Sequence, residues 1–137
     1  MSTLTGSAQE MLDRFSACKG WEQRARLLLQ YGQQLPALPA EARIDEHLIR
    51  GCESPVWCVI DWPAGRLGLQ LDTDARLLKG LLAVLRSRLE GLTAEELQTA
   101  DLPGWFSELG LASRISSSRS NGLNAVYQYI QKQAAQP

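Results

Sequence analysis

Three cysteines and one histidine are the side chains of this 137-residue sequence with the widest chemical repertoire. Cys52 stands in the stretch LIRGCESPVW, after Gly51, which permits positive φ, and before Ser54-Pro55, where the proline disfavours helical backbone. These neighbours predict a tight turn between extended segments, with the sulfur projecting away from the chain. Because functional residues concentrate on loops, Cys52 is the candidate reactive group, with an inconsequential loop cysteine as the alternative.

The other two cysteines have the surroundings of core residues. Cys18 comes near the end of an amphipathic segment, and Cys58 lies inside an apolar one. Free cysteine is among the most buried residue types, so we expect both thiols to be enclosed. An odd number of cysteines without a secretory leader also argues against a disulfide framework.

Three chemistries compete for Cys52. A cysteine hydrolase needs a base close to the sulfur, but the single histidine, His47, is five residues upstream, where we expect it to be exposed. A zinc or iron–sulfur site needs several clustered soft ligands, and Cys52, Cys58 and His47 offer three at most, without a CxxC unit. A thiol relay, which accepts a group and hands it on, needs only one exposed cysteine. The sequence favours the relay.

The segments around Cys52 predict an α+β fold: a small antiparallel sheet of about three strands, packed on one face by several helices. Residues 56–62 are apolar, and in residues 66–72 leucines alternate with other residues, as in a strand with one buried face. Pro63-Ala64-Gly65 between them is typical of a hairpin turn. Residues 48–50 would add a short strand before the cysteine turn.

Apolar residues at helical spacing predict the helices that cover this sheet. Residues 75–89 should form the central helix, because leucines cover most of its circumference, and Asp72, Thr73 and Asp74 are candidates for its N-cap. Further helices are expected from the capping boxes Ser7–Glu10 and Thr93–Glu96, from Trp21 to Leu35, over Asp101–Leu109 and from Ser118 onwards. Without repeats or internal linkers, residues 1–137 are expected to be a single domain.

Charge and hydropathy exclude two classes of partner. Fourteen basic residues against fifteen acidic ones give a net charge of −1, whereas a nucleic-acid surface normally carries a basic excess. The sequence has no apolar run long enough to span a bilayer, and the start MSTLTGSAQEM lacks a leader pattern. We therefore expect a cytoplasmic protein that binds neither nucleic acid nor membranes.

The stretch GCESPVW resembles the G-C-x-S-x-V-W signature of the SufE and CsdE family of sulfur acceptors, which act in cysteine desulfuration. The resemblance covers nearly the whole chain. It continues, in order, through WEQRARLLLQYGQQLPALP, LDTDARLLKGLLAVL, LTAEEL and SRISSSRSNGL, and LPALP, EGLTAEELQ and SELGL look more like the CsdE branch. It implies a SufE-like fold, similar to that of iron–sulfur scaffold proteins, and an accessory protein rather than an enzyme.

The resemblance also implies a function for Cys52. A PLP-dependent cysteine desulfurase (SufS- or CsdA-like) would hand sulfur to Cys52, which would carry it as a persulfide to an iron–sulfur scaffold or another acceptor. The PLP belongs to the desulfurase, and no cofactor or metal is expected in this chain. Two alternatives remain: a non-catalytic binding module that activates a partner enzyme without carrying sulfur, and a metal or iron–sulfur scaffold protein.

Four further residues are candidate contacts of the cysteine turn or of the partner: Gly51, Glu53, Ser54 and Arg119. Glu53 would tend to raise the pKa of the neighbouring thiol by like-charge repulsion. Arg119 matches the S-R-x-x-G-L motif of the family and falls in the first turn of the last predicted helix, where a cation opposes the helix dipole. Helix stability alone would therefore not select it. An exposed arginine, or one paired with a nearby carboxylate, is the alternative.

Overall fold

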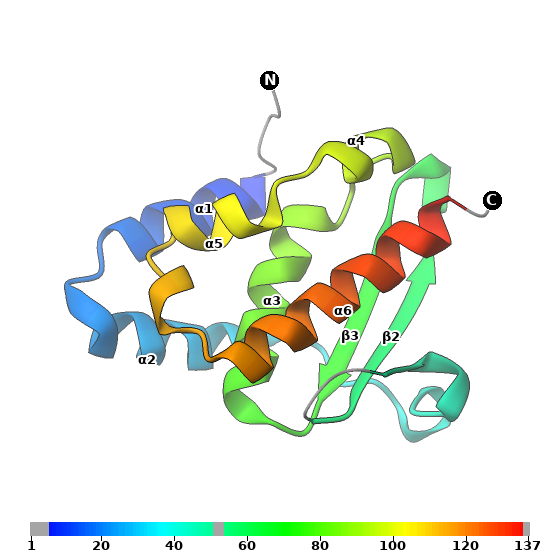
Figure 1. The fold of residues 1–137 in the computed structure, drawn as a ribbon, viewed down its shortest axis with the longest axis horizontal. Coiled ribbons are helices and arrows are strands. Elements are labelled where there is room, and N and C mark those ends of the chain that lie inside the picture. Colours follow the sequence, from blue (N-terminus) through cyan, green and yellow to red (C-terminus); the bar gives the residue numbers. More distant parts are fainter. Residues whose placement is uncertain (1–5, 51–53, 136–137) are drawn as a thin grey trace.

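The computed structural model describes residues 6–50 and 54–135, which form the predicted α+β fold (Figure 1). The helices are α1 (Gly6–Ser16), α2 (Gly20–Gln34), α3 (Arg76–Leu89), α4 (Ala94–Thr99), α5 (Leu102–Glu108) and α6 (Ser117–Ala134). Single 3₁₀ turns are η1 (Ala40–Ala42), η2 (Asp45–His47), η3 (Pro63–Gly65) and η4 (Ala112–Arg114). The strands are β1 (Leu48–Ile49), β2 (Val56–Asp61) and β3 (Gly68–Thr73).

The three strands form one antiparallel sheet in the order β1-β2-β3. Val56 is paired on both sides, with Ile49 of β1 and with Thr73 of β3, so the central strand begins where both neighbours hold it. At the other end of β2, η3 closes the predicted hairpin, with left-handed backbone at Ala64 and Gly65. The hairpin and the short first strand are confirmed.

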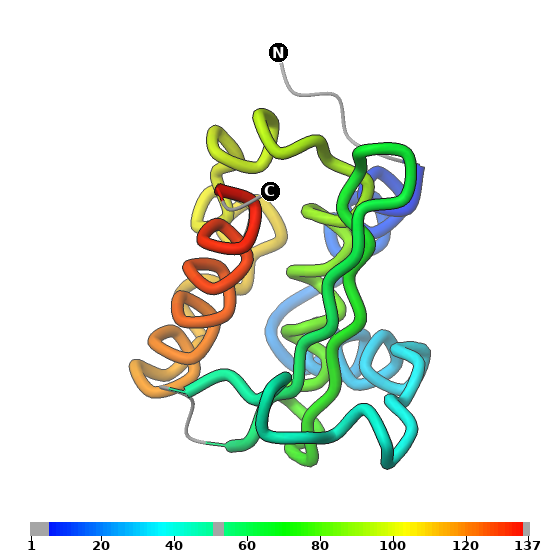
Figure 2. Tube along the Cα trace, turned by 90° about the vertical axis from the view of Figure 1, so that its right-hand side faces the viewer, coloured from blue at the N-terminus to red at the C-terminus, as the bar shows by residue number. Residues whose placement is uncertain are grey.

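Alternation along the strands buries one face of the sheet. Cys58 of β2 and Leu69 and Leu71 of β3 are each 1% exposed. Helix α3 packs along β3, and α6 contacts β1, so helices cover this face, as expected (Figures 1 and 2). None of the helices in the described ranges combines the length and apolarity needed to cross a membrane.

Helix α3 is the centre of the fold, as its leucine pattern predicted. It contacts α1, α2, α5 and α6 as well as β3. Its closest neighbour is α2, because glycines face each other at the crossing. A methyl group on Gly80 would stand 2.9 Å from the carbonyl carbon of Leu28, and one on Gly32 would stand 2.9 Å from the Gly80 nitrogen. The two helices therefore meet backbone against backbone.

The residues at which the helices begin agree only in part with those predicted from the sequence. The Thr93–Glu96 capping box closes the first turn of α4, with both reciprocal hydrogen bonds present, and Asp101 caps α5. By contrast, Ser7 lies within α1 and is not its N-cap. Helix α6 begins at Ser117, one residue earlier than predicted, because the Ser116 hydroxyl accepts a hydrogen bond from a backbone N–H of the first turn.

The predicted N-cap of α3 is wrong. The N-cap residue is Ala75, which has no side chain able to accept a hydrogen bond from the first turn. Asp72 and Thr73 still belong to β3 and are buried, with exposed fractions of 0% and 3%. Their polar groups bind elsewhere in the fold, close to the candidate site.

Candidate functional site

Three of the predicted site residues, Gly51, Cys52 and Glu53, lie outside the described residues, and the role of Cys52 stays a prediction. The structure describes the chain on both sides of them. Because Ile49 pairs with Val56, residues 50–55 connect two antiparallel neighbouring strands. We call residues 50–55 the cysteine segment. At its described ends Arg50 is exposed and Ser54 is half-buried.

The cysteine segment connects to the sheet at the end opposite the hairpin turn η3. The N-terminal end of α6 lies at this same end of the molecule in both views (Figures 1 and 2). Arg119, in the first turn of α6, is half-buried, and no carboxylate of the described residues forms an ion pair with it. The pairing proposed as an alternative for Arg119 is thus absent from the described part of the chain.

An open groove of about 690 Å³ runs between β1 and α6, next to the cysteine segment. Its walls include an apolar residue of β1, two cations and the polar side of α6: Leu48, Arg50, Gln128, Tyr129 and Lys132. None of its described lining residues is acidic. The groove therefore gives another molecule access beside the cysteine segment, in positively charged surroundings.

The two described cysteines differ from each other. Cys58 is 1% exposed, and burial raises the pKa of its thiol to about 12, so the prediction of a core residue is confirmed. Cys18 is only half-buried, and its sulfur lies 3.5 Å from the carbonyl oxygen of Arg14. For Cys18 the prediction is confirmed only in part: it packs against the core, but beyond the end of α1 it is not fully enclosed.

His47 does not have the exposed position expected of it. It is half-buried in η2, and its Nδ1 lies 2.8 Å from the carbonyl oxygen of Ala42, which fixes the ring against a local turn. Across residues 6–50 and 54–135, no three histidine, cysteine or acidic side chains gather in a way that could hold a metal ion.

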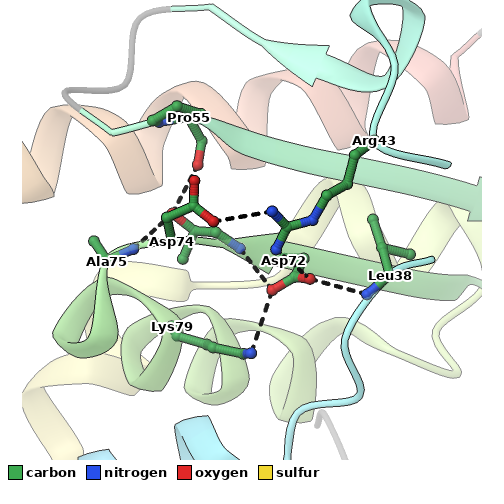
Figure 3. Close-up of polar contacts among 8 residues, drawn as sticks. Leu38, Arg43, Pro55, Asp72, Asp74, Ala75 and Lys79 are labelled. Carbon is green, nitrogen blue, oxygen red and sulfur yellow. Dashed lines mark hydrogen bonds and ion pairs between the residues drawn. The ribbon is translucent and has the colours of Figure 1, made fainter. Parts of the chain in front are cut away.

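A buried carboxylate beside the cysteine segment was missed by the sequence analysis (Figure 3). Oδ2 of Asp72 accepts hydrogen bonds from the Leu38 backbone N–H and from Nη2 of Arg43, each 2.9 Å long. Oδ1 accepts one from the Thr73 backbone N–H at 2.9 Å and lies 3.4 Å from Nζ of Lys79. We call these five residues the Asp72 cluster. It joins the segment after α2, strand β3 and helix α3.

The electrostatics of the Asp72 cluster favour the charged carboxylate. Burial works to raise the pKa of Asp72, but hydrogen bonds from Arg43 and two backbone N–H groups, with the charge of Lys79, outweigh it. The net result is a pKa below the usual value of an aspartate. A carboxylate with this many donors is an anchor, charged at neutral pH and held in one orientation.

Two contacts extend the Asp72 cluster to the end of the cysteine segment. The Thr73 hydroxyl donates a hydrogen bond to the carbonyl oxygen of Pro55 at 2.7 Å. The Arg43 guanidinium carbon lies 4.6 Å from the ring centre of Trp57, which is the second residue of β2. A sequence signal for these contacts is lacking, because they join residues far apart in the chain.

Comparisons with known proteins show the family and the fold of this chain. Residues 9–134 match the family model SufE, described as an Fe-S metabolism associated domain. The sulfur acceptor protein CsdE of Escherichia coli (strain K12) is 40% identical over 127 residues, which span 92% of this chain and 86% of that protein. The solution structure of a hypothetical protein from Thermus thermophilus has the same fold, with a TM-score of 0.76 at 24% identity, covering 97% of this chain and 96% of that one. The motifs, the family model and the identity to CsdE together show that this chain belongs to the SufE family.

Proposed function

We propose that this protein is a sulfur acceptor and activator for a PLP-dependent cysteine desulfurase, with Cys52 as the accepting residue. The observation that carries the proposal is membership of the SufE family, with 40% identity to a protein named as a sulfur acceptor, in a chain that contains the GCESPVW stretch. The protein acts as an accessory partner, and the PLP stays with the desulfurase.

The transfer is a thiol–persulfide exchange. The desulfurase carries sulfur as a persulfide on its own cysteine. The Cys52 thiolate attacks the outer sulfur, and a new S–S bond forms at Cys52 while the S–S bond of the donor breaks. The electron pair of the broken bond leaves with the donor cysteine as thiolate, and the proton of the persulfide travels with the outer sulfur. The donor cysteine is reduced from persulfide to thiolate while Cys52 is oxidised from thiolate to persulfide, so no external oxidant or reductant is needed.

The surroundings of the cysteine segment support this role. Strands β1 and β2 hold the described chain on both sides of this segment, at one end of the sheet. The adjoining groove carries Arg50 and Lys132, and positive charge near a thiol favours the reactive thiolate form. We propose that the desulfurase docks over this end of the molecule, with Gly51, Glu53, Ser54 and Arg119 as contacts.

The second half of the function is delivery. The Cys52 persulfide passes its outer sulfur to the thiol of an iron–sulfur scaffold or of another sulfur acceptor, by the same exchange in the opposite role. Because only the outer sulfur of the persulfide is transferred between thiols, the chain itself needs no metal or cofactor for either step.

The test is intact-mass analysis after incubation with a cysteine desulfurase and L-cysteine. We expect the wild-type protein to gain the mass of sulfur, reversible by a reducing thiol, and to stimulate the desulfurase. Cys52→Ser should fold, gain no sulfur and give no stimulation, because it lacks the accepting thiol.

Cys18→Ser is the matched control, because Cys18 is the half-buried one of the two described cysteines. It should gain sulfur as the wild type does. Full stimulation by Cys52→Ser without any sulfur gain in the wild type would support the binding-module alternative and refute the carrier. Stoichiometric iron or zinc in protein purified without chelators would instead support the scaffold alternative.

A further inference from the structure

The last residue of β3 holds the chain at the point where it leaves the cysteine segment. Val56 and Thr73 form the last pair of the β2–β3 ladder, and the carbonyl oxygen of Pro55 lies just beyond it. The Thr73 hydroxyl donates a hydrogen bond to that oxygen at 2.7 Å. The Thr73 side chain therefore adds one hydrogen bond beyond the end of the β2–β3 ladder, at the carbonyl where the segment containing Cys52 ends.

The requirements of the strand do not explain the hydroxyl. Thr73 is 3% exposed, and valine has the same branched shape and suits a strand as well as threonine does. A hydroxyl is costly to bury unless it is hydrogen-bonded, and here it has two partners. Besides donating to Pro55, Oγ1 lies 3.5 Å from the backbone N–H of Ala75, the N-cap residue of α3. One buried hydroxyl thus links the exit of the cysteine segment to the start of the central helix.

The Asp72 cluster fixes the position of this hydroxyl. The Thr73 backbone N–H donates to Oδ1 of Asp72, whose carboxylate is completely enclosed and is held by Arg43 and Lys79 (Figure 3). Arg43 also binds Asp74 at 2.9 Å, on the other side of Thr73. Asp72 and Asp74, the residues on either side of Thr73, both pair with Arg43. The Thr73 side chain can therefore shift little if Pro55 is displaced.

We propose that Thr73 is a positioning residue for sulfur acceptance at Cys52. The inference rests on the proposed function and adds a residue to it. Cys52 is three residues before Pro55, so the held carbonyl sets where the reactive segment is attached to the sheet. Exchange between a thiolate and a persulfide needs the reacting sulfurs close and aligned, and a misplacement of about 1 Å can cost about 10²-fold in rate. The Thr73–Pro55 hydrogen bond serves that alignment.

The test compares Thr73→Val, which keeps the shape and removes the hydroxyl, with Thr73→Ser, which keeps the hydroxyl. A desulfurase loaded with persulfide is mixed with each variant, and sulfur gain at Cys52 is followed in a single turnover over a range of desulfurase concentrations. We expect Thr73→Val to lower the limiting rate about tenfold, with the half-saturating concentration unchanged within about twofold. Thr73→Ser should restore the limiting rate.

Thr99→Val is the matched control, because the Thr99 hydroxyl also donates to a backbone carbonyl, that of Glu96, but at the exposed end of α4. It should transfer sulfur at the wild-type rate. A wild-type limiting rate in Thr73→Val would refute the positioning role, and so would a Thr73→Ser variant as slow as Thr73→Val.

The remaining outcomes separate this inference from others. If the wild type gains no sulfur at Cys52, the proposed function itself fails, whereas equal transfer by wild type and Thr73→Val overturns only the role of Thr73. If Thr73→Val does not fold, Thr73→Ala tests the same hydrogen bond. If neither variant folds, Thr73 serves the fold as a whole, and the positioning role is wrong.

Discussion

Replacing Asp72 by asparagine should destabilise the protein through the donors that it leaves without an acceptor. The asparagine side chain has nearly the shape of the aspartate, but one carboxylate oxygen becomes an NH₂ group. If the remaining oxygen faces Leu38 and Arg43, the NH₂ group faces the Thr73 N–H and the Lys79 ammonium, which are donors themselves. The opposite orientation creates the same conflict with Leu38 and Arg43.

The magnitude follows from these contacts. A buried N–H left without a partner costs about 1–3 kcal/mol, and a hydrogen bond to a charged group contributes about 1.5–3 kcal/mol. Removing a buried charge recovers part of its desolvation penalty, and Arg43 and Lys79 are 29% and 25% exposed, so water can solvate them. We expect Asp72→Asn to lower the free energy of unfolding by about 2–4 kcal/mol at pH 7.

The difference in unfolding free energy between wild type and Asp72→Asn should change with pH in a definite direction. Folding lowers the pKa of Asp72, so its carboxylate contributes stability above the unfolded-state value of about 3.9 and loses that contribution as pH falls through the lower folded-state pKa. Asparagine does not titrate. The gap in unfolding free energy between wild type and Asp72→Asn should therefore be constant from about pH 5 to 7 and narrow in stronger acid.

Urea unfolding followed by circular dichroism, at pH 7 and at steps below pH 4, measures both quantities. Asp61→Asn is the control, because Asp61 is an exposed aspartate of the same sheet, and its substitution should cost less than about 0.5 kcal/mol. A loss below about 1 kcal/mol for Asp72→Asn at pH 7, or a gap that does not narrow in acid, would refute this account of the Asp72 cluster.

Three other substitutions or treatments test the fold and its thiols. Gly80→Ala should lower the free energy of unfolding by about 2 kcal/mol or more in urea, because the overlap with Leu28 outweighs a gain in helix propensity of about 1 kcal/mol; a stabilised variant would show that α2 and α3 separate easily. Thr93→Ala should cost about 1 kcal/mol in the same assay by removing the capping box, and no loss would mean that water replaces the cap. Iodoacetamide at pH 8, with peptide mass analysis, should label Cys18 in the folded protein and Cys58 only after unfolding, since the pKa of Cys58 is raised to about 12; equal labelling would contradict its burial.

The sequence predicted those parts of the fold that depend on neighbours along the chain. Alternating leucines in residues 66–72, with Pro63-Ala64-Gly65 before them, were enough to place a hairpin, because a strand period and a turn are local properties. The capping box at Thr93 succeeded for the same reason.

The features that failed depend on residues far apart in the sequence. Asp72 precedes a helix and is of a residue type favoured at N-cap positions. Its partner Arg43, however, is 29 residues away, and only the folded chain brings the two together. Cys18 ends an amphipathic segment, but it lies beyond the last residue of α1 and packs against the core only in part. The role of Cys52 remains a prediction from the family motif and the local sequence, whereas Thr73 lies in no such motif.

The enclosure of Cys58 has a consequence for how long the proposed persulfide at Cys52 would keep its outer sulfur. A persulfide decays when a second thiolate attacks its inner sulfur, which forms a disulfide and expels hydrosulfide. Cys58 is six residues after Cys52, near enough in the chain to be the first intramolecular attacker. Burial raises the pKa of Cys58 to about 12, so its thiol stays protonated at pH 7, and the residue is 1% exposed. A protein that accepts sulfur at Cys52 can therefore keep a second thiol close by in sequence without losing its sulfur as sulfide before delivery.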